Sequence, residues 1–168
     1  MIKLIASDVD GTLLPEGTAE LNPELYEVIL KLKEKGIVFA AASGRQENSI
    51  RTVFAPIVDD IYLISNNGGY VTYQNQILVC RTFDREIAKE ILTYIRKMEN
   101  VFYLATSPDG DYTDCQDKEM LEWLKEGYRI HINRIDDVME KADRLVKISA
   151  FAKGRDAVGV AAPAKAPF

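Results

Sequence analysis

The sequence predicts an α/β fold in which part of a parallel sheet is followed by a smaller α+β unit. Over residues 1–65, short apolar runs alternate with helical stretches in the order strand, helix, strand, helix, strand. This order is typical of a right-handed parallel sheet. A polar cluster follows each of the three strands, at residues 8–12, 43–45 and 66–69. Together these observations indicate a partial Rossmann-like core with a ligand site at the strand ends.

Each element of this core has its own signal in the sequence. Residues 2–7 are mostly apolar and stop abruptly at Asp8, as a buried parallel strand does. Asn22 followed by Pro23 predicts a helix start, and Gly36 predicts its end. A second strand is expected over residues 37–42, a short helix over 47–54 and a third strand over 61–64.

The rest of the chain has a different character. Residues 70–73 and 77–80 read as a β-hairpin joined through residues 74–76. Asp84 can cap a helix whose apolar face would be Ile87, Ile91, Leu92 and Ile95. A strand over 101–106, a turn at 108–110, helices near 118–125 and 136–141 and a strand over 145–151 follow. We therefore expect a core over residues 1–81, an α+β unit over 82–151 and a poorly ordered tail over 152–168.

Composition and charge exclude several classes of protein. The 168 residues carry a formal net charge of −5, which argues against a nucleic-acid partner. The chain has no apolar run of about 20 residues, so the sequence predicts no membrane span. Cys80 and Cys115 are far apart and outside any CxxC pattern, so we expect reduced thiols and a cytoplasmic protein.

Two carboxylates one residue apart mark the end of the first strand. In extended backbone Asp8 and Asp10 point the same way, and two like charges so placed favour a bound cation. Mg²⁺ suits this pair, because it prefers oxygen ligands and takes one or two carboxylates together with phosphate oxygens and waters. Gly11 lets the chain turn, and Thr12 adds a hydroxyl. The plainer alternative is a pair of acids that cap a turn.

The motifs resemble those of the haloacid dehalogenase superfamily. Asp8 to Leu14 is similar to the family's first motif, DxDGTL, and Ser43-Gly44-Arg45 is similar to its second. Asn67-Gly68, followed by an α+β insertion, resembles the Cof-like branch, in which a large cap domain is inserted into the core. The resemblance covers about residues 1–151. It implies a Mg²⁺-dependent phosphomonoesterase that acts on small phosphorylated metabolites, such as sugar phosphates or nucleotides, through an aspartyl phosphate.

The resemblance also implies roles for individual residues. Asp8 would be the nucleophile, and Asp10 would protonate the leaving group and then activate water. The Asp8 carboxylate and the Asp10 carbonyl would hold Mg²⁺. The substrate and its phosphate would be bound by Thr12, Ser43, Gly44, Arg45 and Asn67, with Arg45 and Asn67 lying toward the substrate or the cap. Without that role Ser43 would cap a helix, Arg45 would form a surface ion pair and Asn67 would only make a turn.

The chain departs from the family pattern after the insertion. Neither the family's lysine motif nor its acidic GDxxND motif is found in proper form, and we expect a truncated or frame-shifted chain. The first strand would then be a bare sheet edge, which predicts pairing into a homodimer. Three other interpretations stay open: a catalytically inactive phosphate- or partner-binding module, a phosphomutase relative and, with a poorer fit, a phospho-accepting receiver domain.

Overall fold

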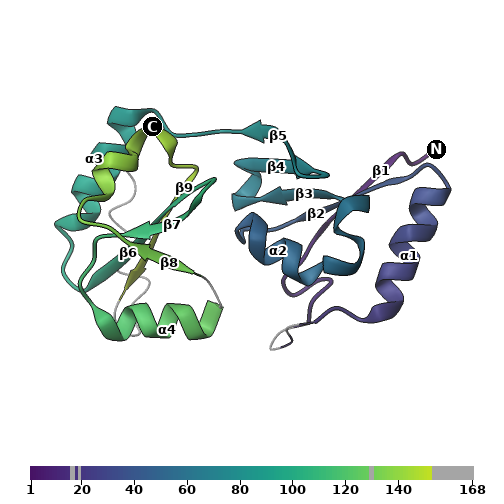
Figure 1. The fold of residues 1–168 in the computed structure, drawn as a ribbon, viewed down its shortest axis with the longest axis horizontal. Helices are drawn as coiled ribbons and strands as arrows, with labels where there is room; N and C mark the ends of the chain where they lie inside the picture. The colour runs from purple at the N-terminus through teal and green to yellow at the C-terminus, as the bar shows by residue number, and fades with distance from the viewer. Residues whose placement is uncertain (16–17, 19, 129–130, 153–168) are drawn as a thin grey trace. The chain divides into compact units, whose positions relative to one another are not determined.

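The chain forms two compact units that divide between Arg81 and Thr82. The computed structural model describes residues 1–15, 18, 20–128 and 131–152. Each unit has its own sheet (Figure 1). The tail expected over residues 152–168 lies outside the described residues, except for Ala152, which ends a strand.

The first unit contains a five-stranded sheet whose strands follow one another in sequence order. They are β1 (Leu4–Asp8), β2 (Val38–Ala42), β3 (Tyr62–Ser65), β4 (Tyr70–Tyr73) and β5 (Gln76–Cys80). The first three strands are parallel, as the sequence predicts, and β4 and β5 continue the sheet antiparallel. Among the described strands β1 pairs only with β2, so it is an edge strand.

The helices of this unit cover one face of the sheet. They are α1 (Pro23–Glu34), α2 (Glu47–Val53) and the 3₁₀ helix η1 (Ala55–Asp60), and α1 and α2 lie on the same side of the strands in Figure 1. Asn22 caps α1 as expected, because its side chain accepts a hydrogen bond from the backbone N–H of Glu24 at 3.0 Å. Alternate strand residues, such as Phe39 and Leu63, pack with these helices in one core. The opposite face leaves Leu4 57% exposed.

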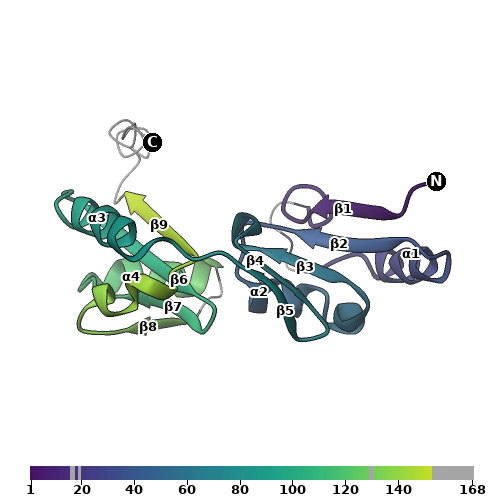
Figure 2. The ribbon, with the colours of Figure 1, turned by 90° about the horizontal axis from the view of Figure 1, so that it is seen from above.

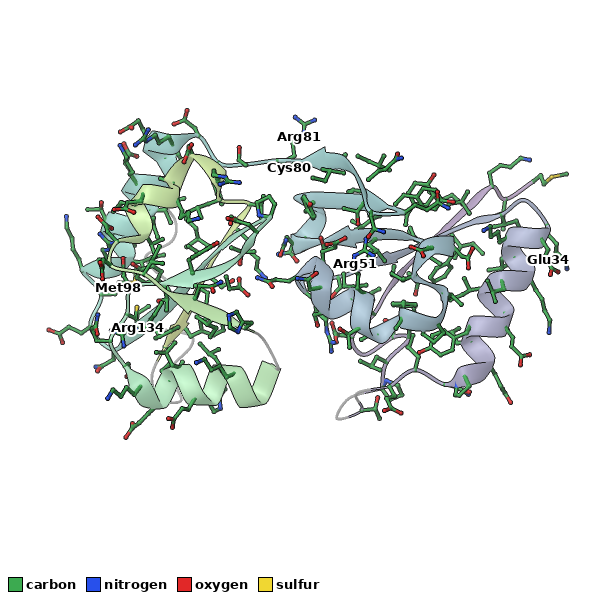
Figure 3. All side chains as sticks on the ribbon, viewed as in Figure 1. Glu34, Arg51, Cys80, Arg81, Met98 and Arg134 are labelled. Atoms are coloured by element: carbon green, nitrogen blue, oxygen red, sulfur yellow. The ribbon has the colours of Figure 1, made fainter. Side chains whose placement is uncertain are left out.

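The turn between β4 and β5 has two residues rather than the expected three. Gln74 and Asn75 both adopt positive φ, at 47° and 63°, and Gln76 already belongs to β5. A two-residue turn with both φ values positive matches the right-handed twist of the paired strands. Cys80, at the end of β5, is an exposed free thiol (Figure 3).

The second unit is a four-stranded sheet between two layers of helix. Its strand order is β8 (Ile132–Arg134), β7 (Gly110–Thr113), β6 (Val101–Ser107) and β9 (Lys147–Ala152). Tyr103 and Ala105 of β6 pack with α3 (Arg85–Arg96) and the 3₁₀ helix η3 (Val138–Arg144). Phe102 and Leu104 pack on the other face in a core that includes α4 (Lys118–Tyr128), as Figure 2 helps to trace. Strand β6 is therefore apolar on both faces.

Several expectations for this unit need correction. Strands β7 and β8 were not predicted, because they are only four and three residues long. The helix expected near residues 136–141 is the 3₁₀ helix η3. Asp84 does cap α3, and Ile91, Leu92 and Ile95 pack in the core as expected, but Ile87 is 40% exposed, and the buried residues of the helix are Ala88, Leu92 and Ile95. These three follow the i, i+4, i+7 spacing of a single helix face.

No helix among the described residues combines the length and the apolar character needed to cross a membrane.

Candidate active site

The loop after β1 presents two carboxylates on one side and buries the residue between them. Asp8 and Asp10 are exposed, whereas Val9 is fully buried. The loop folds back on itself, because the backbone N–H of Gly11 donates to the carbonyl of Leu14 at 2.9 Å and that of Leu14 donates to Val9 at 2.8 Å. Gly11 adopts φ 74°, which favours glycine. The strand end and this closed loop therefore hold both acids at the carboxyl edge of the sheet.

The carboxylate of Asp10 is bound by two side chains from the loop after β2. Arg45 donates from Nη2 to Oδ1 at 2.6 Å, and from Nε to Oδ1 at 3.0 Å and to Oδ2 at 3.1 Å. The hydroxyl of Ser43 donates to Oδ2 at 3.1 Å. Both oxygens of Asp10 are thus occupied by donors. These contacts join the ends of two neighbouring strands, where the polar clusters were expected to meet.

Asp8 is held much more loosely than Asp10. Its one side-chain contact among the described residues is a long hydrogen bond from the hydroxyl of Thr12 to Oδ2, at 3.5 Å. An exposed carboxylate with so few partners can act as a nucleophile or as a ligand of a hard cation. In the described part of the chain no group of three or more His, Cys, Asp or Glu side chains is placed so that it could hold a metal ion by itself. The donor set is therefore one carboxylate with a neighbouring acid, which fits the way Mg²⁺ binds with phosphate and water.

Backbone hydrogen bonds lock the loops after β2 and β3 together. The N–H of Ser43 donates to Ile64 at 2.9 Å. From the short 3₁₀ turn η2 (Asn66–Gly68), Asn66 donates to the carbonyl of Arg45 at 2.9 Å and Asn67 donates to that of Ser43 at 3.2 Å. Asn66 and Asn67 both have positive φ, at 50° and 56°, a conformation that asparagine tolerates better than most residues. This pair of loops forms a fixed support for Ser43 and Arg45.

The structure gathers the residues singled out in the sequence into three groups. Asp10 meets Ser43 and Arg45, Thr12 meets Asp8, and the side chain of Asn67 lies against Gly44. Two further contributors were missed. Ser49 accepts a hydrogen bond from Nη1 of Arg45 at 3.4 Å, and Asn66 supports the Arg45 carbonyl. The run Asn66-Asn67-Gly68 was the available signal, since two adjacent asparagines before glycine favour left-handed turns.

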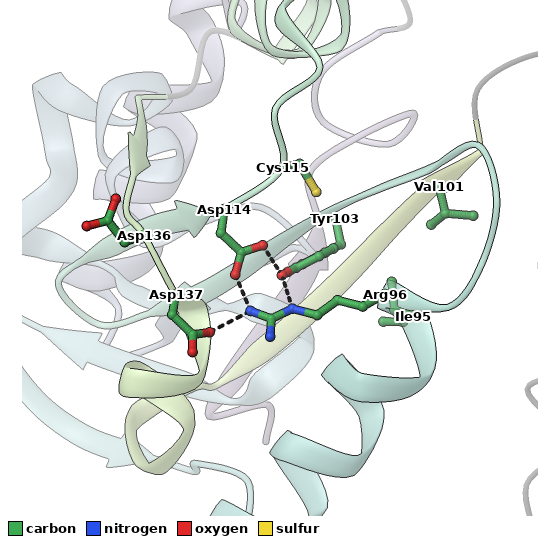
Figure 4. A pocket seen from close by; sticks show the side chains of 8 residues that line it. All are labelled: Ile95, Arg96, Val101, Tyr103, Asp114, Cys115, Asp136 and Asp137. Atoms are coloured by element: carbon green, nitrogen blue, oxygen red, sulfur yellow. Dashed lines mark hydrogen bonds and ion pairs between the residues drawn. The ribbon is translucent and has the colours of Figure 1, made fainter.

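A separate open pocket of about 440 Å³ lies in the second unit (Figure 4). Arg96 donates from Nε to the hydroxyl of Tyr103 at 3.1 Å and from Nη2 to Asp137 at 2.6 Å, and it also binds Asp114. Burial raises the pKa of Tyr103, and so does its hydrogen bond to Asp114. Burial alone would lower the pKa of Arg96, but its bonds to Asp137 and Tyr103 raise it overall. This network ties α3, β6, β7 and the start of η3 together.

Comparison with known proteins identifies relatives for nearly the whole chain. The sequence family described as haloacid dehalogenase-like hydrolase matches residues 5–157. The chain is 24% identical over 136 residues to the 5-amino-6-(5-phospho-D-ribitylamino)uracil phosphatase YbjI of Escherichia coli, covering 81% of this chain and 50% of that protein. It is 25% identical over 149 residues to phosphoglycolate phosphatase 1 of Saccharolobus solfataricus, covering 79% of this chain and 62% of that protein. The chain thus spans only half to two thirds of these relatives.

A solved structure from Eubacterium rectale shares the fold of the chain. It superimposes with a TM-score of 0.84 at 30% identity, over 98% of this chain and 64% of that one. The matched part includes both units, so the α/β core and the following α+β unit occur together in a related protein. The expectation of a Rossmann-like core of this type is therefore confirmed.

Proposed function

This chain belongs to the haloacid dehalogenase-like hydrolases, and on that premise we propose that it is a phosphomonoesterase that works through an aspartyl phosphate. The observation that carries the proposal is the pair Asp8 and Asp10 at the end of β1, one loosely held and the other bound by Ser43 and Arg45. A nucleophile needs a free carboxylate, whereas an acid–base group needs a fixed one. The two neighbouring acids differ in this way.

The chemistry proceeds in two balanced halves. In the first, a carboxylate oxygen of Asp8 bonds to phosphorus while the bond from phosphorus to the leaving oxygen breaks, and that oxygen takes the proton of the Asp10 carboxylic acid. In the second, water gives a proton to the Asp10 carboxylate. The oxygen of that water bonds to phosphorus while the bond from the Asp8 oxygen to phosphorus breaks. Inorganic phosphate leaves, and both side chains return to their starting states.

Mg²⁺ belongs to this proposal as the cofactor. The side chain of Asp8 and the backbone carbonyl of Asp10 would hold it, and when bound it would neutralise charge on the phosphate. Ser43 and Thr12 would donate hydrogen bonds to phosphate oxygens. Gly44 and Asn67 would shape the loop beside them. We propose that the core of residues 1–81 carries this chemistry and that the unit from Thr82 onward is the cap, which selects the substrate.

We propose that the substrate is a small phosphorylated metabolite. The matched relatives are named for phosphates of a ribitylaminouracil and of glycolate, both of them small phosphate esters. The net charge of −5 gives no attraction to nucleic acid. We also propose a cytoplasmic location, since the free thiols of Cys80 and Cys115 suit a reducing compartment.

Hydrolysis of p-nitrophenyl phosphate with Mg²⁺ tests the proposed activity. Wild-type chain should release nitrophenolate, and Asp8→Asn should abolish the release while circular dichroism shows an unchanged fold. Asp59→Asn is the matched control, because Asp59 is an exposed carboxylate in η1 away from the strand-end loops. No turnover by a folded wild-type chain would contradict the proposal. Binding of orthovanadate without turnover would instead support the inactive phosphate-binding module.

We also propose that β1 pairs with β1 of a second copy. The edge of β1 is open among the described strands, and Ile2 and Leu4 are 65% and 57% exposed beside it. Lys3 precedes the strand and Asp8 ends it, so antiparallel pairing would bring opposite charges toward each other. Sedimentation velocity should show a dimer that Leu4→Lys dissociates, because an exposed lysine blocks edge pairing. A wild-type monomer at every concentration would rule this pairing out.

A further inference from the structure

Arg45 binds the carboxylate of Asp10 through two of its side-chain nitrogens. Nη2 lies 2.6 Å from Oδ1, and Nε lies 3.0 Å from Oδ1 and 3.1 Å from Oδ2. A two-nitrogen contact of this kind fixes both the position and the rotation of a carboxylate, which a single point charge cannot do. The ion pair links residues 35 positions apart in the chain.

Arg45 is itself held in place by three other groups. Its backbone N–H donates to the hydroxyl of Ser43 at 3.0 Å, and its carbonyl accepts from Asn66 at 2.9 Å. Its Nη1 donates to Ser49 of α2 at 3.4 Å. The side chain is 33% exposed. These hydrogen bonds hold the guanidinium in place, and the orientation of the Asp10 carboxyl group depends on its position.

We propose that Arg45 is a positioning residue that aims the carboxyl group of Asp10 for proton transfer. This inference rests on the proposed phosphatase function and assigns Arg45 a part in it other than substrate binding. Ser43 assists Arg45, because its hydroxyl donates to Oδ2 of Asp10 at 3.1 Å while Nη2 of Arg45 donates to Oδ1 at 2.6 Å. Both oxygens of the carboxyl group are thereby held.

The choice of leaving group separates positioning from phosphate binding. Nitrophenolate is a good leaving group and departs without a proton, whereas the alkoxide of glycerol 3-phosphate needs one. Loss of an aimed acid should therefore slow the alkyl ester selectively. Loss of a phosphate-binding cation should instead raise KM for both esters to a similar extent, because both carry the same phosphate group.

The experiment measures kcat and KM for both esters with wild type, Arg45→Gln, Arg45→Lys and Asp10→Asn. We expect Arg45→Gln to lower kcat for glycerol 3-phosphate by roughly 10- to 100-fold and kcat for p-nitrophenyl phosphate by less than about threefold. For Arg45→Lys, kcat with glycerol 3-phosphate should lie between those of wild type and Arg45→Gln, because lysine keeps the charge but not the two-nitrogen contact. Adding Arg45→Gln to Asp10→Asn should cause no further loss with glycerol 3-phosphate, since the group being aimed is already absent.

Arg51→Gln is the matched control, because Arg51, labelled in Figure 3, forms its ion pair with Glu47 of the same helix α2, at 2.7 Å, and not with Asp10. This variant should leave kcat and KM for both esters unchanged. Equal losses of kcat on the two esters, a rise in KM alone, or no loss with Arg45→Gln would each overturn the inference while the phosphatase function stands. A folded wild-type chain that hydrolyses neither ester would overturn the proposed function, and this inference with it.

Discussion

The side-chain oxygen of Asn67 lies so close to Gly44 that a Cβ atom at position 44 would be 2.7 Å from it. The two residues come from neighbouring loops, one after β2 and the other within η2. Real Cβ atoms essentially never approach another atom so closely. Glycine at position 44 is thus what lets the loop after β3 pack against the loop that carries Ser43 and Arg45.

Gly44→Ala should displace the side chain of Asn67 and destabilise the first unit by about 1 kcal/mol, a cost at the low end for overpacking. We expect the low end because Asn67 is exposed and can turn away. Urea unfolding followed by circular dichroism measures the loss. Combining Gly44→Ala with Asn67→Gly removes the obstructing side chain and should restore most of the lost stability. An equal loss with and without Asn67→Gly would show that the contact is not the cause.

Asp114→Ala should destabilise the second unit by roughly 1–3 kcal/mol, because it removes the acceptor of the Tyr103 hydroxyl and one of the two carboxylates that bind Arg96 in a partly buried site. Trp123, the only tryptophan, lies in α4 of this unit, so its fluorescence during urea unfolding reports on this unit. Asp136→Ala is the control, since Asp136 lines the same pocket but is exposed. Equal stabilities for the two variants would argue against a supporting role for the Asp114 network.

Asp109 should make the second unit less stable in acid. Hydrogen bonds from Ser107, and then from Tyr112 and Lys141, hold the pKa of Asp109 at about 2, below its ordinary value of 3.8. A carboxyl group with a lowered pKa in the folded state stabilises that state above its ordinary pKa, and the contribution is lost as the pH falls toward the folded-state value.

The measurement is the urea midpoint of Trp123 fluorescence from pH 7 to pH 2, for wild type and Asp109→Asn. Wild type should be the more stable near neutral pH, and the difference should shrink between about pH 4 and pH 2. Asp143→Asn, at an exposed position of η3, should follow wild type throughout. A difference that does not change with pH would mean that the Asp109 side chain stabilises the unit by something other than its charge.

Local signals in the sequence were sufficient to predict most helices and strands of the first unit. Neighbouring residues alone indicate the helix that Asn22 caps and Pro23 begins, and the three apolar strands β1, β2 and β3. The structure contains each of these elements. The short strands β7 and β8 were missed because three or four residues carry too little periodicity; β7 is held by its pairing with β6, and β8 by its pairing with β7.

The sequence by itself determined the family motifs and the place of Asp8, Asp10 and Ser43 at strand ends. These depend on local patterns and on the parallel order of the strands, which short-range chemistry specifies. Only the tertiary structure decided that Arg45 binds Asp10 and that Asn67 packs on Gly44. Such contacts join residues that are distant in the chain, and which donor reaches which acceptor depends on how separate loops pack, a property that no local pattern encodes.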